Sequence, residues 1–119
     1  MATDSDDLPA RWLKGLIEAC VLSILRTGPA YGYEIARRFE VLGLPKPKGG
    51  TLYPILARHE RDGLVEPTWV EGDGGPGRKY YLLTPAGQRH VEMITHEWQR
   101  FGPRVSELLS VPVVRKEPA

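Results

Sequence analysis

The sequence has very little cysteine, no long apolar segment and almost no net charge. Its 119 residues include one cysteine, Cys20, which excludes a disulfide framework and a cysteine-based zinc site. Lys14, Glu18 and Arg26 interrupt the longest apolar run, so no stretch reaches the roughly 18–20 residues of a membrane span. The 16 Lys and Arg face 15 Asp and Glu, a net charge of +1. This balance excludes a uniformly basic nucleic-acid protein, and any such function must depend on where the cations lie.

The residues that would indicate catalysis or metal binding are also missing. We find no paired carboxylates with a pocket, no nucleophile–base arrangement and no phosphate loop, since the glycine-rich residues 72–77 lie between two strands and do not precede a helix. His90 and His96 are six residues apart and do not share a helix face, so they make a poor metal pair. We therefore expect no enzyme, no metal and no cofactor. The polar, acidic first seven residues do not resemble a signal peptide, and we expect a cytoplasmic protein without a membrane partner.

Thirteen glycines and 11 prolines divide the chain into short elements. Apolar periodicity predicts helices at residues 10–27 and 31–41, then a third helix, capped near Gly50 or Thr51 with Pro54 in its first turn, that ends near residue 62. Two strands follow at residues 64–71 and 78–83, joined by a flexible, glycine-rich tip at residues 72–77. Residues 1–10 and 111–119 have no periodicity and are expected to be flexible tails.

The last helix, at residues 84–110, is expected to mediate dimerisation. Thr84 and Pro85 are suited to its N-cap and first position. Its apolar residues recur in steps of three and four, as in a coiled-coil seam: Val91, Ile94, Trp98, Phe101, Val105 and Leu108. Gly102–Pro103 should kink or break this helix.

Three helices, a strand, a glycine-rich tip and a second strand give the order of a winged helix-turn-helix domain, which we assign to residues 11–83. The fold is expected to be mainly α with a small β-hairpin. Charge supports DNA binding, because residues 37–61 contain six cations and two acids, a net charge of +4. The alternative is a winged-helix protein-interaction module that does not bind DNA and would have no basic surface on the third helix.

The candidate DNA contacts lie on the third helix, on the loop before it and at the wing. Thr51 and Tyr53 are at the helix start, and Arg58 is on the face away from the apolar residues. Arg78 and Lys79 begin the second strand, where alternation lets only one face outward, and Lys46 and Lys48 lie in the loop. The alternatives are a solvated helix face with a structural tyrosine, and a charged strand edge that prevents aggregation.

Several segments resemble the PadR family of transcriptional regulators: GPAYGYEI at residues 28–35, GTLYP at 50–54, RDGLV at 61–65, RKYYLLT at 78–84 and Gly87. The resemblance covers about residues 12–109 and points to the short branch, which has a single C-terminal dimerisation helix. It implies a homodimer that binds a palindromic operator, represses transcription and is released by a small molecule. It also adds Tyr31 to the candidate DNA contacts. The sequence departs from the usual family pattern at two places. Lys48–Gly49 weakens capping of the third helix or moves its start later, and His59 puts a titratable group on an apolar face.

The resemblance further implies a ligand slot at the dimer interface. Trp98 matches the position of a tryptophan that stacks planar aromatic ligands between subunits in multidrug-binding members of the family. The residues that would surround it are Gly15, Ala19, Val91, Ile94 and Thr95. The plainer interpretation is that Trp98 packs in the dimer core. His59 is expected to be a semi-buried residue with one hydrogen bond, and Cys20 to be inert packing.

Overall fold

The helices and strands follow the predicted order, with one short strand added. The computed structural model describes residue 13 and residues 16–72 and 74–115. Its elements are α2 (Ile17–Ile24), the 3-10 turn η1 (Leu25–Thr27), β1 (Ala30–Tyr31), α3 (Gly32–Val41), α4 (Gly49–Arg61), β2 (Val65–Gly72), β3 (Gly75–Leu83) and α5 (Pro85–Leu109). Residues 1–10 and the first residues of the predicted helix at 10–27 lie outside the described part.

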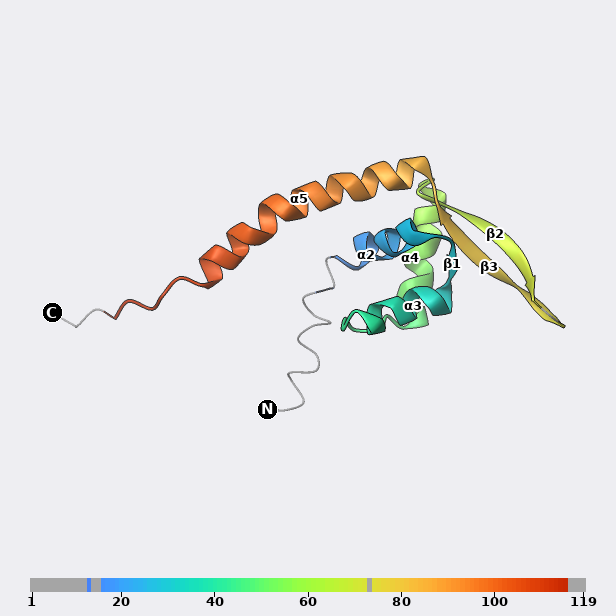
Figure 1. Cartoon of the computed structure of the whole chain (residues 1–119), viewed down its shortest axis with the longest axis horizontal. Coiled ribbons are helices and arrows are strands. Elements are labelled where there is room, and N and C mark those ends of the chain that lie inside the picture. The colour runs from blue at the N-terminus through green and yellow to red at the C-terminus, as the bar shows by residue number, and fades with distance from the viewer. Residues whose placement is uncertain (1–12, 14–15, 73, 116–119) are drawn as a thin grey trace.

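The core lies where α2, α3, α4 and the base of the sheet meet. Each helix contributes its apolar stripe, and Leu22, Ile35, Phe39 and Leu56 are fully buried. Figure 1 shows α3 beneath α2, α4 running upright alongside them, the sheet along one side and α5 passing over the top. The three helices and the sheet therefore form the winged helix-turn-helix body that the sequence predicts.

The sheet has three antiparallel strands in the order β1-β3-β2, so the predicted hairpin is extended by one strand. Tyr31 of β1 pairs with Tyr80 of β3, and Ala30 pairs with Tyr81. Two residues are too few for a periodic pattern, which is why the sequence did not predict β1. This pairing attaches the root of the wing to the start of α3.

The hairpin tip is shorter than predicted. We expected residues 72–77 to be a flexible loop, but β2 continues to Gly72 and β3 begins at Gly75, and these two glycines pair. Gly74 has φ +70°, a left-handed conformation that glycine adopts without strain. The glycines therefore lengthen the wing as strand residues, and a register shift between Val70 and Gly72 accommodates them.

α4 begins earlier than predicted. Its N-cap is Lys48, because the N–H groups of Thr51 and Leu52 both donate to the Lys48 carbonyl at 2.9 Å. The predicted cap at Gly50 or Thr51 is therefore wrong, as is the expected later start. Pro54 lies inside the helix beyond its first turn, where it cannot supply the i+4 N–H that would otherwise bond the Gly50 carbonyl.

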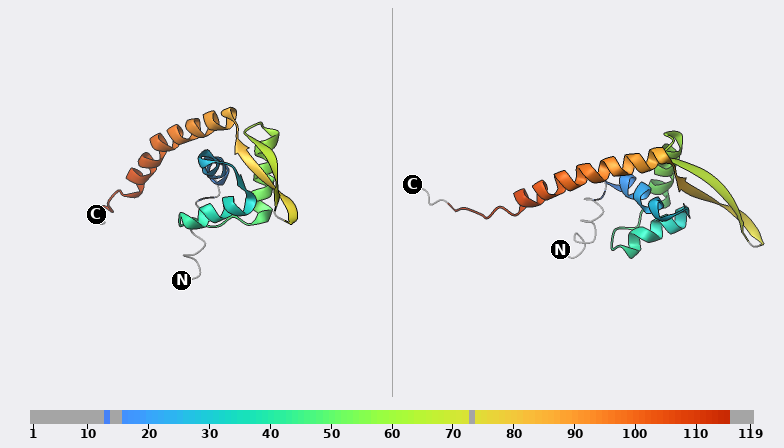
Figure 2. Two further views of the ribbon diagram at one scale, coloured as in Figure 1. Left: turned by 45° about the vertical axis from the view of Figure 1, so that its right-hand side comes forward. Right: turned by 45° about the horizontal axis from the view of Figure 1, so that its top comes forward.

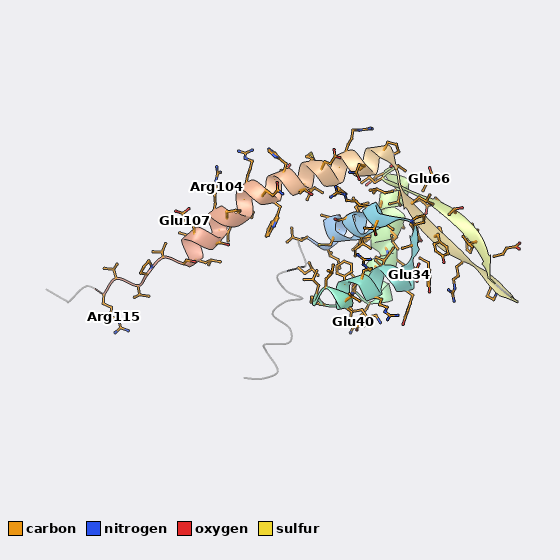
Figure 3. The ribbon with its side chains drawn as sticks, viewed as in Figure 1. Glu34, Glu40, Glu66, Arg104, Glu107 and Arg115 are labelled. Atoms are coloured by element: carbon orange, nitrogen blue, oxygen red, sulfur yellow. The ribbon has the colours of Figure 1, made fainter. Side chains whose placement is uncertain are left out.

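α5 continues through Gly102–Pro103, so the expected break is absent. Thr84 caps it as predicted, and its Oγ1 accepts the Gly87 N–H at 3.0 Å. Figures 1 and 2 show a gently curved helix that extends well beyond the body. Arg104 and Glu107 lie on this projecting half (Figure 3).

This projection makes the molecule long and thin. It measures 77 × 35 × 21 Å, with a radius of gyration of 18.7 Å. A compact chain of this length has a radius of gyration of about 13–14 Å. The segment after α5, residues 111–115, has no regular structure and is exposed. No helix in the described ranges has the length and apolar composition required to cross a membrane.

Candidate nucleic-acid interface

The first turn of α4 is exposed and lacks a side-chain cap, as the departure at Lys48–Gly49 predicts. The N–H groups of Gly49 and Gly50 form no hydrogen bond with any residue that the structure describes. Free N–H groups at a helix start carry partial positive charge and bind phosphate well. Lys48 and Thr51 are exposed beside them. This turn therefore presents donors and a cation to an anionic partner.

Tyr53 lies directly across Gly32 at the start of α3. A Cβ on Gly32 would come 2.5 Å from Oη and 2.8 Å from Cε1 of Tyr53, so the ring needs glycine there. The side chain is nevertheless 53% exposed. A hollow of about 560 Å³ adjoins the ring and is lined by Gly32, Tyr33, Ala36, Lys46, Pro47, Lys48, Gly49, Leu52 and Tyr53. Gly32 thus holds an exposed phenol beside two loop lysines.

Tyrosines and cations form a continuous row from the wing to the loop before α4. The Tyr31 ring stacks on Tyr33, with centroids 6.3 Å apart, and meets Tyr80 edge-on at 5.3 Å. The Arg78 guanidinium lies 4.6 Å from the Tyr31 centroid, and the Lys46 ammonium lies 5.2 Å from that of Tyr33. These cation–π contacts hold both cations at the surface. Tyr33, 56% exposed, is missing from the predicted set, although its spacing of two from Tyr31 was visible.

Two of the predicted DNA contacts are paired with acids of the same chain. The Arg58 guanidinium forms an ion pair with Glu18 of α2, and the Lys79 ammonium lies 3.1 Å from the carboxylate of Glu60 of α4. The hydrogen bond to Glu60 is the main cause of a raised Lys79 pKa. Arg78 and Lys79 lie on opposite sides of the sheet, as alternation predicts. Six predicted contacts are thus free of ion pairs among the described residues: Tyr31, Lys46, Lys48, Thr51, Tyr53 and Arg78.

The residues expected to form a ligand slot do not line one cavity in a single chain. Val91 is 3% exposed within the core of its own chain, so it does not present a wall to a ligand. Ala19, Ile94 and Thr95 are half-buried, and Gly15 lies outside the described residues. The reason is that α2 and the first half of α5 already pack together.

Trp98 instead faces an apolar groove on the projecting half of α5. The groove has a volume of about 1120 Å³ and is lined by Leu16, Trp98, Phe101, Gly102, Pro103, Val105, Ser106, Glu107, Leu109 and Ser110. A Cβ on Gly102 would lie 3.3 Å from the indole, so the ring lies against the backbone there. Trp98 is 49% exposed and Phe101 61%. Large apolar side chains thus remain uncovered along this half of the helix.

His59 and Cys20 are packed as expected and do not form a site. His59 is 5% exposed, and its Nε2 lies 3.0 Å from the Glu18 carbonyl oxygen, to which it donates. Burial is the main cause of its lowered pKa. Burial also raises the pKa of the Cys20 thiol, which disfavours the reactive thiolate. Among the described residues, no three His, Cys, Asp or Glu side chains could hold a metal together.

The helix-turn-helix of α3 and α4, with the basic start of α4 and the β2–β3 wing, defines a winged helix-turn-helix DNA-binding protein. A family model described as "Transcriptional regulator PadR-like family" matches residues 21–93. The chain belongs to this family, which confirms the resemblance seen in the sequence and makes the protein a transcriptional regulator. One long helix after the sheet, in the described part of the chain, is consistent with the short branch.

Solved structures give the same fold. A PadR family transcriptional regulator from Eggerthella lenta is 32% identical with a TM-score of 0.80, covering 94% of this chain and 99% of that one. A PadR-like transcriptional regulator from Bacillus cereus is also 32% identical, with a TM-score of 0.76 and coverage of 86% and 99%. An uncharacterized protein from Lysinibacillus sphaericus is 26% identical over 72% of this chain and 81% of its own length. Family membership favours DNA binding over the protein-interaction module.

Proposed function

We propose that the protein is a transcriptional repressor that binds operator DNA as a homodimer and is released by a small ligand. The observation that carries the DNA-binding mode is the uncapped, exposed first turn of α4, flanked by Lys46, Lys48 and Tyr53. With α4 in the major groove, its free N–H groups and the lysines contact phosphates, while Thr51 and Tyr53 reach the base edges. Tyr31 and Arg78 extend the contact toward the wing.

Arg58 and Lys79 are also proposed to contact phosphates, although each is paired with a carboxylate of its own chain. Each reaches a phosphate only by leaving its carboxylate partner, Glu18 or Glu60. The Arg58–Glu18 pair is about half exposed and the Lys79–Glu60 pair about one-third exposed, and because solvent reaches both, such pairs contribute only about 0–1 kcal/mol, so a phosphate can replace the acid. These two cations therefore add less to affinity than Lys46 and Lys48.

The projecting half of α5 supports the homodimer. Its apolar side chains remain half to three-quarters exposed in the single chain, at Trp98, Phe101 and Leu108. A second copy that packs along this helix would bury them, as in a coiled-coil seam. Two recognition helices related by twofold symmetry then contact half-sites roughly 10 bp apart, which matches a palindromic operator.

The ligand site is proposed between the two subunits, at the paired Trp98 side chains. A planar aromatic molecule that stacks there displaces α5 against α2 and changes the separation of the recognition helices. Release of DNA requires that the ligand bind the two dimer arrangements unequally. Ala19, Ile94 and Thr95 lie on the adjoining helix faces, while the core position of Val91 gives it a supporting role.

Operator binding is tested by titrating labelled DNA from upstream of the protein's own gene at several salt concentrations. Lys48→Gln is expected to weaken binding and to lower the salt dependence by about one phosphate contact. The matched control is Arg104→Gln on the projecting half of α5, which removes the same charge and should bind like the wild type. Equal binding by the two variants, or no binding by the wild type, would contradict the proposal.

Ligand binding is tested separately, with proflavine as a planar aromatic probe. Proflavine should quench tryptophan fluorescence in the wild type and weaken operator binding, and Trp98→Ala should lose both effects. Equal quenching of Trp98→Ala would rule out the slot while leaving the DNA-binding proposal intact.

A further inference from the structure

Trp69 is a large aromatic side chain on the wing for which the fold offers no packing. It belongs to β2 and is 69% exposed. Across the ladder it pairs with Lys79, and a Cβ on the diagonal neighbour Gly77 would lie 3.7 Å from the indole six-membered ring. Because Gly77 has no side chain, the ring rests on the backbone of β3 and keeps its outer face in solvent. A core role does not explain this tryptophan.

The register places Trp69 on the side of the wing that faces the recognition helix. Trp69 pairs with Lys79, and residues directly opposite in an antiparallel ladder share a face. Lys79 reaches Glu60 of α4, so this face is the one toward α4. Val70, the next residue, pairs with Arg78 and lies on the opposite face. The indole therefore opens into the space between α4 and the outer wing.

We infer that Trp69 packs against the sugar–phosphate strand of the DNA that passes between the recognition helix and the wing. This inference rests on the proposed operator binding. When α4 occupies a major groove and the wing reaches along the duplex, one backbone strand must cross the space that Trp69 faces. The charge on this face is also compatible with a DNA strand, because Lys79 neutralises Glu60, an acid that would otherwise repel phosphates.

The chemistry of indole favours the deoxyribose over the phosphate. β2 carries Glu66 and Glu71, so the strand itself does not attract an anion. An uncharged ring with an apolar face covers the apolar edge of a sugar, and its single N–H satisfies a nearby oxygen. Trp69 thus adds contact area that depends little on salt, unlike the contacts of Lys46 and Lys48.

The test compares Trp69→Ala, Trp69→Phe and the matched control Val70→Ala in operator titrations at several salt concentrations. Trp69→Ala should weaken binding about five- to thirtyfold, as truncation of an interface tryptophan commonly does. Trp69→Phe should fall between Trp69→Ala and the wild type. Val70→Ala, which shortens an exposed apolar side chain opposite Arg78 on the other face of the wing, should weaken binding less than Trp69→Ala does. The salt dependence should stay unchanged in all three, because no ionic contact is lost.

A second measurement follows the indole directly. Operator DNA should protect part of the wild-type tryptophan fluorescence from acrylamide, and Trp69→Phe should lose this protection. If the wild type binds the operator while Trp69→Ala binds as tightly as Val70→Ala, the inference fails and the proposed function stands. A salt dependence lowered by Trp69→Ala, or protection that grows with protein concentration without DNA, would also overturn it. If the wild type binds no operator, both the Trp69 inference and the proposed operator binding are wrong.

Discussion

The Nε2 of His59 lies 3.0 Å from the carbonyl oxygen of Glu18, so a hydrogen bond joins α4 directly to α2. The same glutamate pairs through its carboxylate with Arg58, the preceding residue of α4. α2 also packs against α5. The recognition helix is therefore linked through one α2 residue to the helix that borders the proposed dimer interface.

The first prediction concerns the pH dependence of stability at His59. Burial lowers the His59 pKa in the folded chain below the ordinary value of 6.5, and the nearby His90 and Arg58 act in the same direction, against an opposing effect of Glu18. The unfolded chain therefore takes up the proton first as the pH falls. The free energy of unfolding should decrease from about pH 6.5 downward until the pH passes the folded pKa.

Urea unfolding at a series of pH values measures this effect. His59→Gln keeps an N–H donor for the Glu18 carbonyl but does not titrate, so it should lose this part of the pH dependence. The difference between the wild type and His59→Gln removes the contribution of the carboxylates. Parallel curves for the two proteins would contradict the prediction.

The second prediction concerns competition for Arg58. Glu18→Gln removes the acid that holds the guanidinium and should raise operator affinity at low salt up to about fivefold, since the pair contributes at most about 1 kcal/mol. Unfolding stability should change by less than about 1 kcal/mol, because both side chains are roughly half exposed. In an Arg58→Gln background, Glu18→Gln should leave the affinity unchanged. An equal gain in both backgrounds would indicate a general charge effect instead.

The third prediction concerns the seam on α5. Phe101→Asp introduces a charge at an exposed apolar position of the projecting helix and should convert a dimer into a monomer of 13.3 kDa in sedimentation. Gln99→Asp places the same residue two positions earlier, outside the predicted seam, and should remain dimeric. A wild-type monomer at micromolar concentration would refute the seam.

The fourth prediction concerns the glycine beneath Tyr53. Gly32→Ala places a methyl group 2.5 Å from the Tyr53 hydroxyl, so the exposed ring must move outward. Stability should change little, because the clash involves the free end of a side chain. Operator affinity should fall as far as it does in Tyr53→Ala. The double variant should bind no worse than either single variant, and additive losses would show that Gly32 acts through another residue.

The sequence predicted the elements whose residues carry a clear local pattern. Thr84–Pro85 identified the start of α5, and the glycines after α3 and α4 marked their ends, with φ values of +77° at Gly43 and +74° at Gly63. His59 and its single hydrogen bond were also foreseen. The helix starts and ends depend on neighbours within a few residues along the chain, whereas the hydrogen bond of His59 reaches Glu18, 41 residues away.

The features that the sequence did not predict depend on contacts between distant residues. β1 exists because β3 pairs with it, and the start of α4 is set by hydrogen bonds to Lys48. Spacing alone showed Arg58 on a free face, but could not show that Glu18, 40 residues away, holds it. Likewise, Val91 matched the seam period, yet tertiary packing buries it within its own chain.

The pairing of β3 divides the wing into two parts with different stiffness. β1 and β2 flank β3 on both sides only at Tyr80 and Tyr81, whereas from Gly75 to Lys79 it pairs with β2 alone. A two-stranded ribbon twists and bends more readily than a three-stranded sheet. We therefore expect the outer arm to bend more easily than the three-stranded root, so that the arm adjusts to a bound duplex while α4 stays in place.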